Sequence, residues 1–250
     1  AWVRVDLPAE LFMYYGGEPL DDDPETVWQG FHAVWHVDDV LIGRDSAGSF
    51  DLIDVSGPPA AVDGVVGRGA ELEESNENIG DSMCAPGSFK LTALSSFSYS
   101  LWVKRGVQIG EFDMPFDAGG NSRVYGGFSI EIGLADWKAG IADEVDIGYS
   151  LVPIGGSNNE WQHLAVSLER GTPSMIRTYL DGISAQSVMT TEGDITTTEP
   201  ICLGGRYKFT GQVDEARIHD GALGAEWYAA EFVTADPQYL DFGPQEDVAP

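Results

Sequence analysis

The sequence predicts an all-β fold that is built from two antiparallel sheets packed as a sandwich. Three observations support this prediction. Apolar and polar residues alternate with a period of two along many short segments, turn residues such as glycine separate these segments, and only one short stretch has helical spacing. With 250 residues, the chain is long enough for one large β domain or two small ones, and no repeat that would indicate a propeller or a solenoid is visible.

The expected strands are the segments in which every second residue is apolar. They lie at residues 31–37, 97–104, 128–134, 145–151, 164–168, 176–180 and 213–218. The pair Asp181-Gly182 separates two such segments, and this dipeptide is typical of the two-residue turn of a β-hairpin. One short helix is expected around residues 225–232, with Trp227 and Phe232 among the residues that would pack inward.

The chain is strongly acidic. Its 41 Asp and Glu residues outnumber its 13 Lys and Arg residues, which gives a formal net charge of −28. Such a surface repels nucleic acid and anionic membranes, so both are excluded as partners. No apolar run approaches the ~20 residues of a membrane span. The acidity favours an extracellular or cell-surface protein of a marine or high-salt bacterium, because hydrated carboxylates keep a protein soluble in salt.

The two cysteines, Cys84 and Cys202, lie far apart in the sequence and form no CxxC motif, which excludes a zinc ribbon and a thioredoxin-like site. A single disulfide and two buried free thiols are equally open alternatives. The N-terminal residues lack the charged-then-apolar layout of a signal peptide. We therefore expect the chain to be a mature product or a piece of a longer protein.

Several motifs occur in a fixed order along the chain. They are FHAVWHVDDV (31–40), RDSAG (44–48), FSYSLWVKR (97–105), WQHLAVSLERG (161–171), YLDGISA (179–185) and ICLGGRYKFTGQVDEARIHDGALGAEW (201–227). In this order and spacing, the sequence resembles the laminin-G/concanavalin A-like lectin and glucanase domains over about residues 31–233. The resemblance implies a jelly-roll sandwich of two antiparallel sheets, an extracellular setting, a frequent calcium ion, and binding to glycans or proteins.

The resemblance also suggests how the chain is divided. Residues 1–30 are similar to the end of an uncharacterised domain that often precedes such domains in bacterial surface proteins. This gives an N-terminal segment at 1–30, a laminin-G-like sandwich at 31–235 and a polar, proline-bearing C-terminal tail at 236–250. Either the chain belongs to a longer surface protein, or its first strands complete the sandwich.

The strongest candidate for catalysis is the acidic segment Asp143-Glu144-Val145-Asp146. Retaining glycosidases on this kind of jelly roll carry carboxylates at alternate positions of one strand, and their mechanism needs two carboxyl groups about 5–5.5 Å apart. Glu144 and Asp146 are in register, but Gly148 or Tyr149 stands where the second glutamate would be. The sequence contains no nucleophile elbow or P-loop either, so we predict that the protein is not an enzyme.

Calcium is the cofactor that the resemblance implies. Asp45 in RDSAG and Asp214 in GQVDEARI match positions where the family often places acidic ligands of a structural calcium ion. This ion takes about six to eight oxygen ligands, which include backbone carbonyls that a sequence does not reveal. The alternative for Asp214 is a carboxylate that forms a salt bridge or caps a turn.

Glycan recognition requires a flat aromatic side chain for the apolar face of the sugar and polar side chains for its hydroxyls. Trp137 lies in the polar, turn-like segment LADWKAG and is therefore the expected stacking residue. The expected polar partners come from two glycine-rich segments: Asn121, Arg123, Tyr125, Arg206 and Tyr207. The other tryptophans of the family motifs and of the helix are expected to pack in the interior: Trp35, Trp102, Trp161 and Trp227.

Together these features predict a non-catalytic binding or adhesion module of a bacterial cell-surface or secreted protein. Its expected partner is a carbohydrate or a cell-surface protein, with calcium holding the loops. The alternative is a structural spacer or protein–protein interaction module of a larger surface assembly, without a small ligand.

Overall fold

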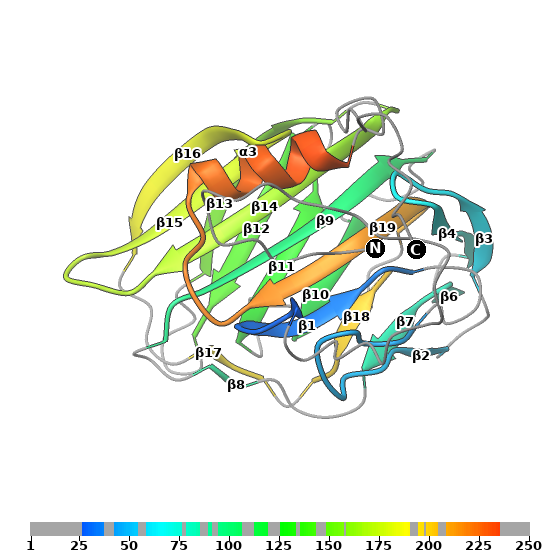
Figure 1. Ribbon diagram of the computed structural model, residues 1–250, viewed down its shortest axis with the longest axis horizontal. Helices are drawn as coiled ribbons and strands as arrows, with labels where there is room; N and C mark the ends of the chain where they lie inside the picture. The colour runs from blue at the N-terminus through cyan, green and yellow to red at the C-terminus, as the bar shows by residue number, and fades with distance from the viewer. Residues whose placement is uncertain are drawn as a thin grey trace, which may run out of the picture.

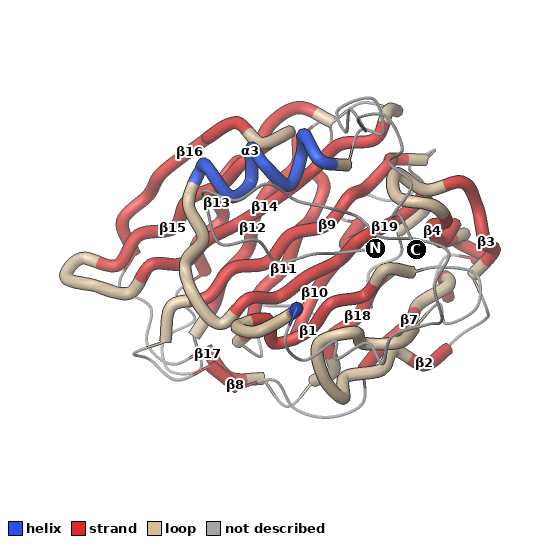
Figure 2. The backbone as a smooth tube through the Cα atoms, viewed as in Figure 1, coloured by secondary structure: helices blue, strands red, loops and turns tan. Residues whose placement is uncertain are grey.

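Two antiparallel sheets pack face to face in the computed structural model of the protein, which confirms the predicted jelly-roll sandwich (Figures 1 and 2). The structure describes residues 27–37, 43–54, 59–76, 79–85, 90–91, 95–106, 113–119, 126–133, 136–143, 149–157, 159–190, 195–197, 199–204 and 209–235. Short two-stranded ribbons flank the sheets: β17 (Ile195–Thr196) pairs with β8 (Lys90–Leu91), and β5 (Glu74–Asn76) pairs with β6 (Ile79–Gly80).

Sheet A forms the layer beneath the helix in Figure 1. Its strand order is β16 (Ile183–Thr190), β15 (Ser174–Leu180), β14 (Trp161–Glu169), β9 (Phe97–Arg105), β19 (Gly211–His219), β4 (Arg68–Leu72) and β3 (Ala60–Asp63), and β1 (Phe31–Trp35) also pairs with β19. Strand β19 is long enough to serve two strands on one side. Its first half pairs with β4 and its second half pairs with β1.

Sheet B forms the second layer. Its strand order is β13 (Tyr149–Gly156), β12 (Asp136–Ala142), β11 (Gly127–Ile132), β10 (Asp113–Ala118), β18 (Ile201–Leu203), β7 (Met83–Ala85) and β2 (Ile53–Asp54). Neighbours such as β10 and β18 lie far apart in the sequence, so the sheet depends on long-range pairing.

The core lies between the two sheets and follows the predicted alternation of residues. In β9, up to Val103, and in β11 every second residue is apolar, fully buried and part of one cluster, whereas the residues between them, which include Trp102, face away from it. Tyr99 of β9 packs on Phe128 of β11 with ring centroids 4.4 Å apart, and its hydroxyl donates a hydrogen bond to the backbone oxygen of Ser129. Each such buried side chain stabilises the fold by about 1.5–3 kcal/mol.

The predicted hairpin and helix are both present. Asp181 and Gly182 have φ values of 50° and 74°, as a two-residue turn between β15 and β16 requires. Helix α3 (Ala225–Thr234) crosses the outer face of sheet A (Figure 1). Gly182 also lies directly under this helix, where a Cβ atom would come within 2.9 Å of the Cα atom of Ala229. No helix in the described ranges is long and apolar enough to cross a membrane.

Cys84 and Cys202 form a disulfide bond, which resolves the two alternatives that the sequence left open. They occupy directly opposite positions on β7 and β18. The residues on either side of each cysteine belong to the core, so the alternation of the strands places the disulfide on the outer face of sheet B. The bond links residues that are 118 positions apart in the sequence.

Candidate ligand-binding site

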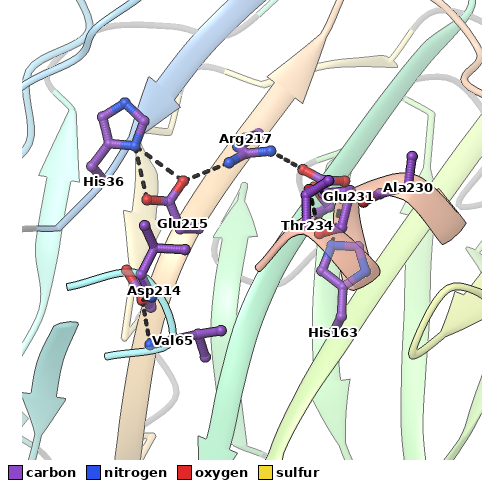
Figure 3. A network of polar contacts seen from close by, with 11 residues as sticks. His36, Val65, His163, Asp214, Glu215, Arg217, Ala230, Glu231 and Thr234 are labelled. Atoms are coloured by element: carbon purple, nitrogen blue, oxygen red, sulfur yellow. Dashed lines mark hydrogen bonds and ion pairs between the residues drawn. The ribbon is translucent and has the colours of Figure 1, made fainter. Parts of the chain in front are cut away.

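A chain of buried charges runs across the outer face of sheet A (Figure 3). Arg217 of β19 lies between two glutamates: its Nη2 atom donates to Glu215 at 2.5 Å, and its Nη1 atom donates to Glu231 of α3. The chain ends in two histidines. Nδ1 of His36 is 2.9 Å from Glu215 Oε1, and Nε2 of His163 is 3.3 Å from Glu231 Oε2. This cluster, called the Arg217 network, ties the segment after β1, β19, β14 and α3 together.

The network keeps its central groups charged despite burial. Burial opposes the charge of Arg217, but attraction to Glu231 and Glu215 outweighs this effect and raises the pKa of the guanidinium. Burial would likewise raise the pKa of Glu231, yet Arg217 and His163 lower this pKa to about 2. Glu231 is therefore ionised at neutral pH, and the helix is held to the sheet by a full ion pair.

An irregularity in β19 places these side chains. The register between β19 and β9 shifts between Asp214 and Arg217, and Glu215 has a positive φ of 49°. Such a bulge redirects the side chains of the strand. Val213, Ala216 and Ile218 remain in the core, while Glu215 and Arg217 reach the outer face and Asp214 contacts the turn between β3 and β4.

A narrow surface depression, which encloses no space large enough for a water molecule, lies beside the network at the start of α3. It is called the α3 hollow, and its lining consists of Phe31, Ser98, Tyr99, Ser100, Arg217, His219, Leu223, Trp227, Tyr228 and Glu231. Trp227 is 44% exposed, whereas Arg217 and Glu231 are at most 9% exposed. The hollow therefore has an accessible indole at its rim and an ion pair at its floor.

The rim is aromatic on both sides. The ring of Phe31 lies 6.0 Å from that of Trp227 and 5.0 Å from that of His219, measured between centroids. At the floor, Ser100 Oγ donates to Glu231 Oε2 at 3.5 Å. Exposed aromatic rings at the rim can stack on the apolar face of a sugar, whereas the polar groups at the floor are buried and fix the position of the rim.

The sequence did not identify this site, because Trp227 was expected to pack inward. The structure corrects this expectation. The buried residues of α3 are Tyr228 and Glu231, which are three positions apart and therefore share one face of the helix. The helix directs Glu231 toward the sheet because Glu231 pairs there with Arg217. In this orientation Trp227 lies at the side of the helix and stays partly exposed. An arginine on the partner strand was the signal that could have revealed this arrangement.

Trp137 was expected to be exposed, and that prediction is wrong. Its side chain is 0% exposed and belongs to the core, where its ring lies 6.4 Å from that of Phe209. Its Nε1 atom donates to Gln162 Oε1 at 3.0 Å. The segment that looked like a turn forms β12, and Trp137 occupies one of the inward positions of this strand. Trp137 therefore cannot stack on a ligand.

The predicted polar ligand residues stay predictions. Asn121, Arg123, Tyr125, Arg206 and Tyr207 all lie outside the described residues. The described residues that flank the two segments lie along different parts of β10. After the first segment, Phe128 faces Ala118 at the C-terminal end of β10, whereas the amide of Gly204, before the second segment, donates to the carbonyl of Pro115.

Asp45, a predicted calcium ligand, is 4% exposed and holds a turn. Its Oδ1 atom accepts hydrogen bonds from the amides of Val34 and Ala47, both at 2.9 Å, and its Oδ2 atom accepts one from the amide of Phe50 at 3.1 Å. Because N–H donors occupy both oxygens, the arrangement suits a turn-holding carboxylate better than a metal ligand.

Asp214, the other predicted ligand, is 0% exposed. Its Oδ2 atom accepts hydrogen bonds from the amides of Val65 and Val66, at 2.8 and 3.0 Å, and so caps the turn between β3 and β4. Its Oδ1 atom is buried and has no hydrogen-bond partner among the described groups. Burial raises the pKa of this carboxyl to about 7. Within the described part of the chain, no group of three or more His, Cys, Asp and Glu side chains could hold a metal ion.

A family model described as the concanavalin A-like lectin/glucanases superfamily, of the laminin G type, matches residues 77–227, which is more than half of the chain. The chain belongs to this superfamily. No curated protein matches it in sequence.

Similar solved structures include binding domains of toxins and a domain of an extracellular arabinanase. The binding domain of Paraclostridial Mosquitocidal Protein 1 is 18% identical with a TM-score of 0.63, over 82% of this chain and 52% of that one. A second similar structure is Domain 4 of AbnA, a GH43 extracellular arabinanase from Geobacillus stearothermophilus, in complex with arabinotriose. It is 19% identical with a TM-score of 0.61, over 80% of this chain and 97% of that one. The binding domain of botulinum neurotoxin DC, in complex with rat synaptotagmin II, is 10% identical with a TM-score of 0.61, over 83% and 52%.

These likenesses concern the fold alone, because the identities are low. The chain spans about half the length of the toxin binding domains and nearly the whole length of the arabinanase domain. The jelly roll described above therefore corresponds to a complete domain in one of these proteins and to part of a larger unit in the others.

The first prediction concerns the Arg217 network. Glu231→Gln removes a charge that pairs with the buried Arg217, and we expect the free energy of unfolding to fall by about 3–5 kcal/mol. The control is Glu226→Gln, which alters an exposed position of the same helix and should change stability by at most about 0.5 kcal/mol. Urea unfolding followed by circular dichroism gives both values, and equal losses would contradict a structural role of the ion pair.

The second prediction concerns pH and is tested in EDTA. The folded pKa of Asp214 is about 7, above its ordinary value of 3.8. Its contribution to stability is therefore fully present below pH 3.8, declines as the pH rises and is lost above about pH 7. Between about pH 5.5 and 7, Asp214→Asn should remove a decline of up to ~1.4 kcal/mol per pH unit. Glu226→Gln is the control. If the free energy of unfolding of Asp214→Asn depends on pH in the same way as that of this control and of the wild type, the pKa of the Asp214 carboxyl is not raised.

Proposed function

We propose that this domain is a non-catalytic carbohydrate-binding module of an extracellular protein. Two findings support the proposal beyond its superfamily. The domain of the arabinanase that binds arabinotriose corresponds to this fold over 97% of its length. The disulfide between Cys84 and Cys202 is typical of a protein that matures in an oxidising compartment outside the cytosol.

The observation that carries the proposal is the exposed indole of Trp227 beside the α3 hollow. A sugar ring would stack on this exposed indole at the surface, while the buried Arg217, Glu231 and Ser100 beneath it would hold the rim in place rather than contact the sugar. The Arg217 network holds the floor in place before a ligand arrives, so little conformational entropy is lost on binding. The α3 hollow is too narrow to admit even a water molecule, so a sugar would lie across its rim rather than inside it.

The charges at the site favour binding over hydrolysis. A glycosidase needs one carboxylic acid that donates a proton and a second carboxylate nearby. Glu231 has a pKa of about 2, because Arg217 holds its ionised form, so it carries no proton to donate at neutral pH. Glu215 is paired to the same arginine. Both carboxylates therefore serve the structure of the site.

The third prediction tests the sugar site. Trp227→Ala should weaken glycan binding by about tenfold or more, because loss of one stacked aromatic ring removes on the order of 1.5 kcal/mol. Ile53→Ala is the matched control, since it also truncates an exposed apolar side chain but lies on β2 of the other sheet. Glycan arrays followed by calorimetry with arabino-oligosaccharides measure both variants.

Each outcome of this experiment is informative. Equal binding by wild type and Trp227→Ala would place the sugar site elsewhere. A wild-type protein that binds no glycan but forms a stable complex with a protein partner would refute the carbohydrate proposal in favour of a protein-interaction module.

Calcium remains part of the proposal, with Asp214 as its carboxylate ligand. The buried Oδ1 atom, which has no hydrogen-bond partner among the described groups, is free to coordinate a cation. The remaining ligands would be backbone carbonyls and water, which suit this ion. A cation at this position would neutralise a buried carboxylate and fix the turn between β3 and β4 against β19.

The fourth prediction tests this ion. Millimolar Ca²⁺ added to EDTA-treated protein should raise the melting temperature of the wild type, because an ion that binds only the folded state stabilises it. The rise in melting temperature should be smaller for Asp214→Asn than for the wild type. For Asp45→Asn it should equal the rise of the wild type. Differential scanning fluorimetry with Mg²⁺ as a parallel control measures the shifts, and equal behaviour of all three proteins would remove Asp214 as a ligand.

A further inference from the structure

The edges of the two sheets differ in how they are protected. An edge strand exposes unpaired backbone N–H and C=O groups, and proteins usually block such edges with short strands, charges, proline or bulges. Within the described residues, β2 contains two residues and β3 contains four, with an ion pair of 2.6 Å between Asp63 and Arg68 at its end. Strand β13 contains Pro153, which has no N–H, and its register with β12 shifts next to it.

The outer side of β1 is protected in another way. The loop at residues 43–50 lies along this strand, Asp45 forms a β-bridge with Trp35, and the amide of Ser46 donates to the carbonyl of Val34 at 2.8 Å. The edges formed by β2, β3, β13 and β1 therefore each carry a feature that blocks the addition of a further strand.

Strand β16 is less protected, because its bulge is confined to Ala185, between the residues that pair with Thr178 and Tyr179. It is eight residues long, with the sequence ISAQSVMT, and contains neither a charged residue nor proline. Ile183, Val188 and Met189 are 73%, 39% and 68% exposed. Its pairing with β15 is regular from Thr190 to Gln186, so this part of the edge is straight. Among the described residues no strand pairs with its far side, and β16 forms the outer margin of the molecule in Figure 1.

The charge around β16 identifies the partner that it can accept. Residues 174–190, which form the β15–β16 hairpin, contain one cation, Arg177, and one anion, Asp181, so their net charge is zero. The whole chain has a net charge of −28. Two copies of this protein repel each other over most of their surfaces, and this repulsion is smallest where two neutral hairpins meet.

We propose that two copies of the chain associate through β16, antiparallel to each other about a twofold axis, so that their A sheets join into one continuous sheet. Antiparallel pairing of a strand with itself satisfies the twofold symmetry, because a residue i that faces residue j of the other copy is matched by j facing i, and only a residue at the axis meets its own equivalent. Val188 and Met189 are neighbours in the strand and point to opposite faces of the sheet, so each face gains an apolar contact across the interface.

Dimerisation would place two α3 hollows on one particle. If the hollows bind sugar as proposed above, a glycan surface would be bound bivalently, and the second contact would benefit from a high effective concentration. The dimer itself does not depend on this, since the observations that support it are the length, exposure and charge of β16.

Sedimentation equilibrium of the wild-type protein tests the fifth prediction without any glycan. We expect a monomer–dimer equilibrium that shifts toward dimer as NaCl rises from about 0.05 to 0.5 M, because salt screens the repulsion between the acidic chains. Met189→Glu should raise the dissociation constant at least about tenfold, because it places two like charges near the twofold axis. Ile53→Glu adds the same charge at an exposed position of β2 and should leave the dissociation constant nearly unchanged.

Hydrogen exchange identifies the strand that pairs. The amides among residues 186–189 that point away from β15 should become protected as the protein concentration rises, whereas those of β2 should not. A protein that stays monomeric at all concentrations in 0.5 M NaCl would overturn the proposal, as would a dimer that Met189→Glu leaves intact. Glycan binding by monomeric Met189→Glu would show that the sugar site stands independently of the dimer.

Discussion

The ion pair between Arg217 and Glu231 is the interaction on which the outer face of sheet A depends. It joins α3 to β19, the strand that contacts β9, β4 and β1, and so links the helix to the centre of the sheet. Removing one partner would leave a buried charge uncompensated, which is why such a pair fixes the position of an element more strictly than apolar contacts do. Apolar packing completes the interface: Phe232 of the helix stacks on Trp102 at 5.4 Å, and the guanidinium of Arg217 lies 5.5 Å from the ring of Trp28. The α3 hollow exists because this arrangement leaves Trp227 beside a fixed polar floor.

The bulge in β19 explains how one strand serves two purposes. Without the register shift, the alternation of the strand would place Asp214 on the same face as Ala216 and Ile218, inside the core. With the shift, Asp214 caps the β3–β4 turn while Glu215 and Arg217 lie on the outer face. The price is a positive φ at Glu215 and a buried carboxyl whose pKa rises to about 7. Strained, redirected residues of this kind tend to gather where a protein builds a site.

Much of this fold could be predicted from the sequence, because the period-two pattern reflects which residues face the core. The strand at 97–104, the turn at Asp181-Gly182 and the helix near residue 225 all depend on such local patterns, and each is present. The site was harder to predict, because exposure is decided by partners that are distant in sequence. Trp137 looked exposed from its polar neighbours, yet it faces inward on β12 and finds a hydrogen-bond acceptor in Gln162. Trp227 looked buried from the apolar spacing of the helix, yet the partner of that helix is an arginine, which draws Glu231 inward instead. The disulfide was undecided for the same reason, since only strand pairing places Cys84 opposite Cys202.

The acidic residues of the chain are absent from one exposed edge strand, β16, and this absence is informative. A net charge of −28 keeps copies of the chain apart by long-range repulsion, and this protection makes blocked edges less necessary over most of the molecule. Yet β2, β3, β13 and β1 are blocked by length, charge, proline or a covering loop, whereas β16 is a long edge strand with neither charge nor proline. If β16 were merely unprotected, charged residues at its exposed positions would have been compatible with the fold, since side chains there face solvent. The absence of charge and of proline at the same edge is therefore best explained by a function of that edge, which is to receive another neutral strand.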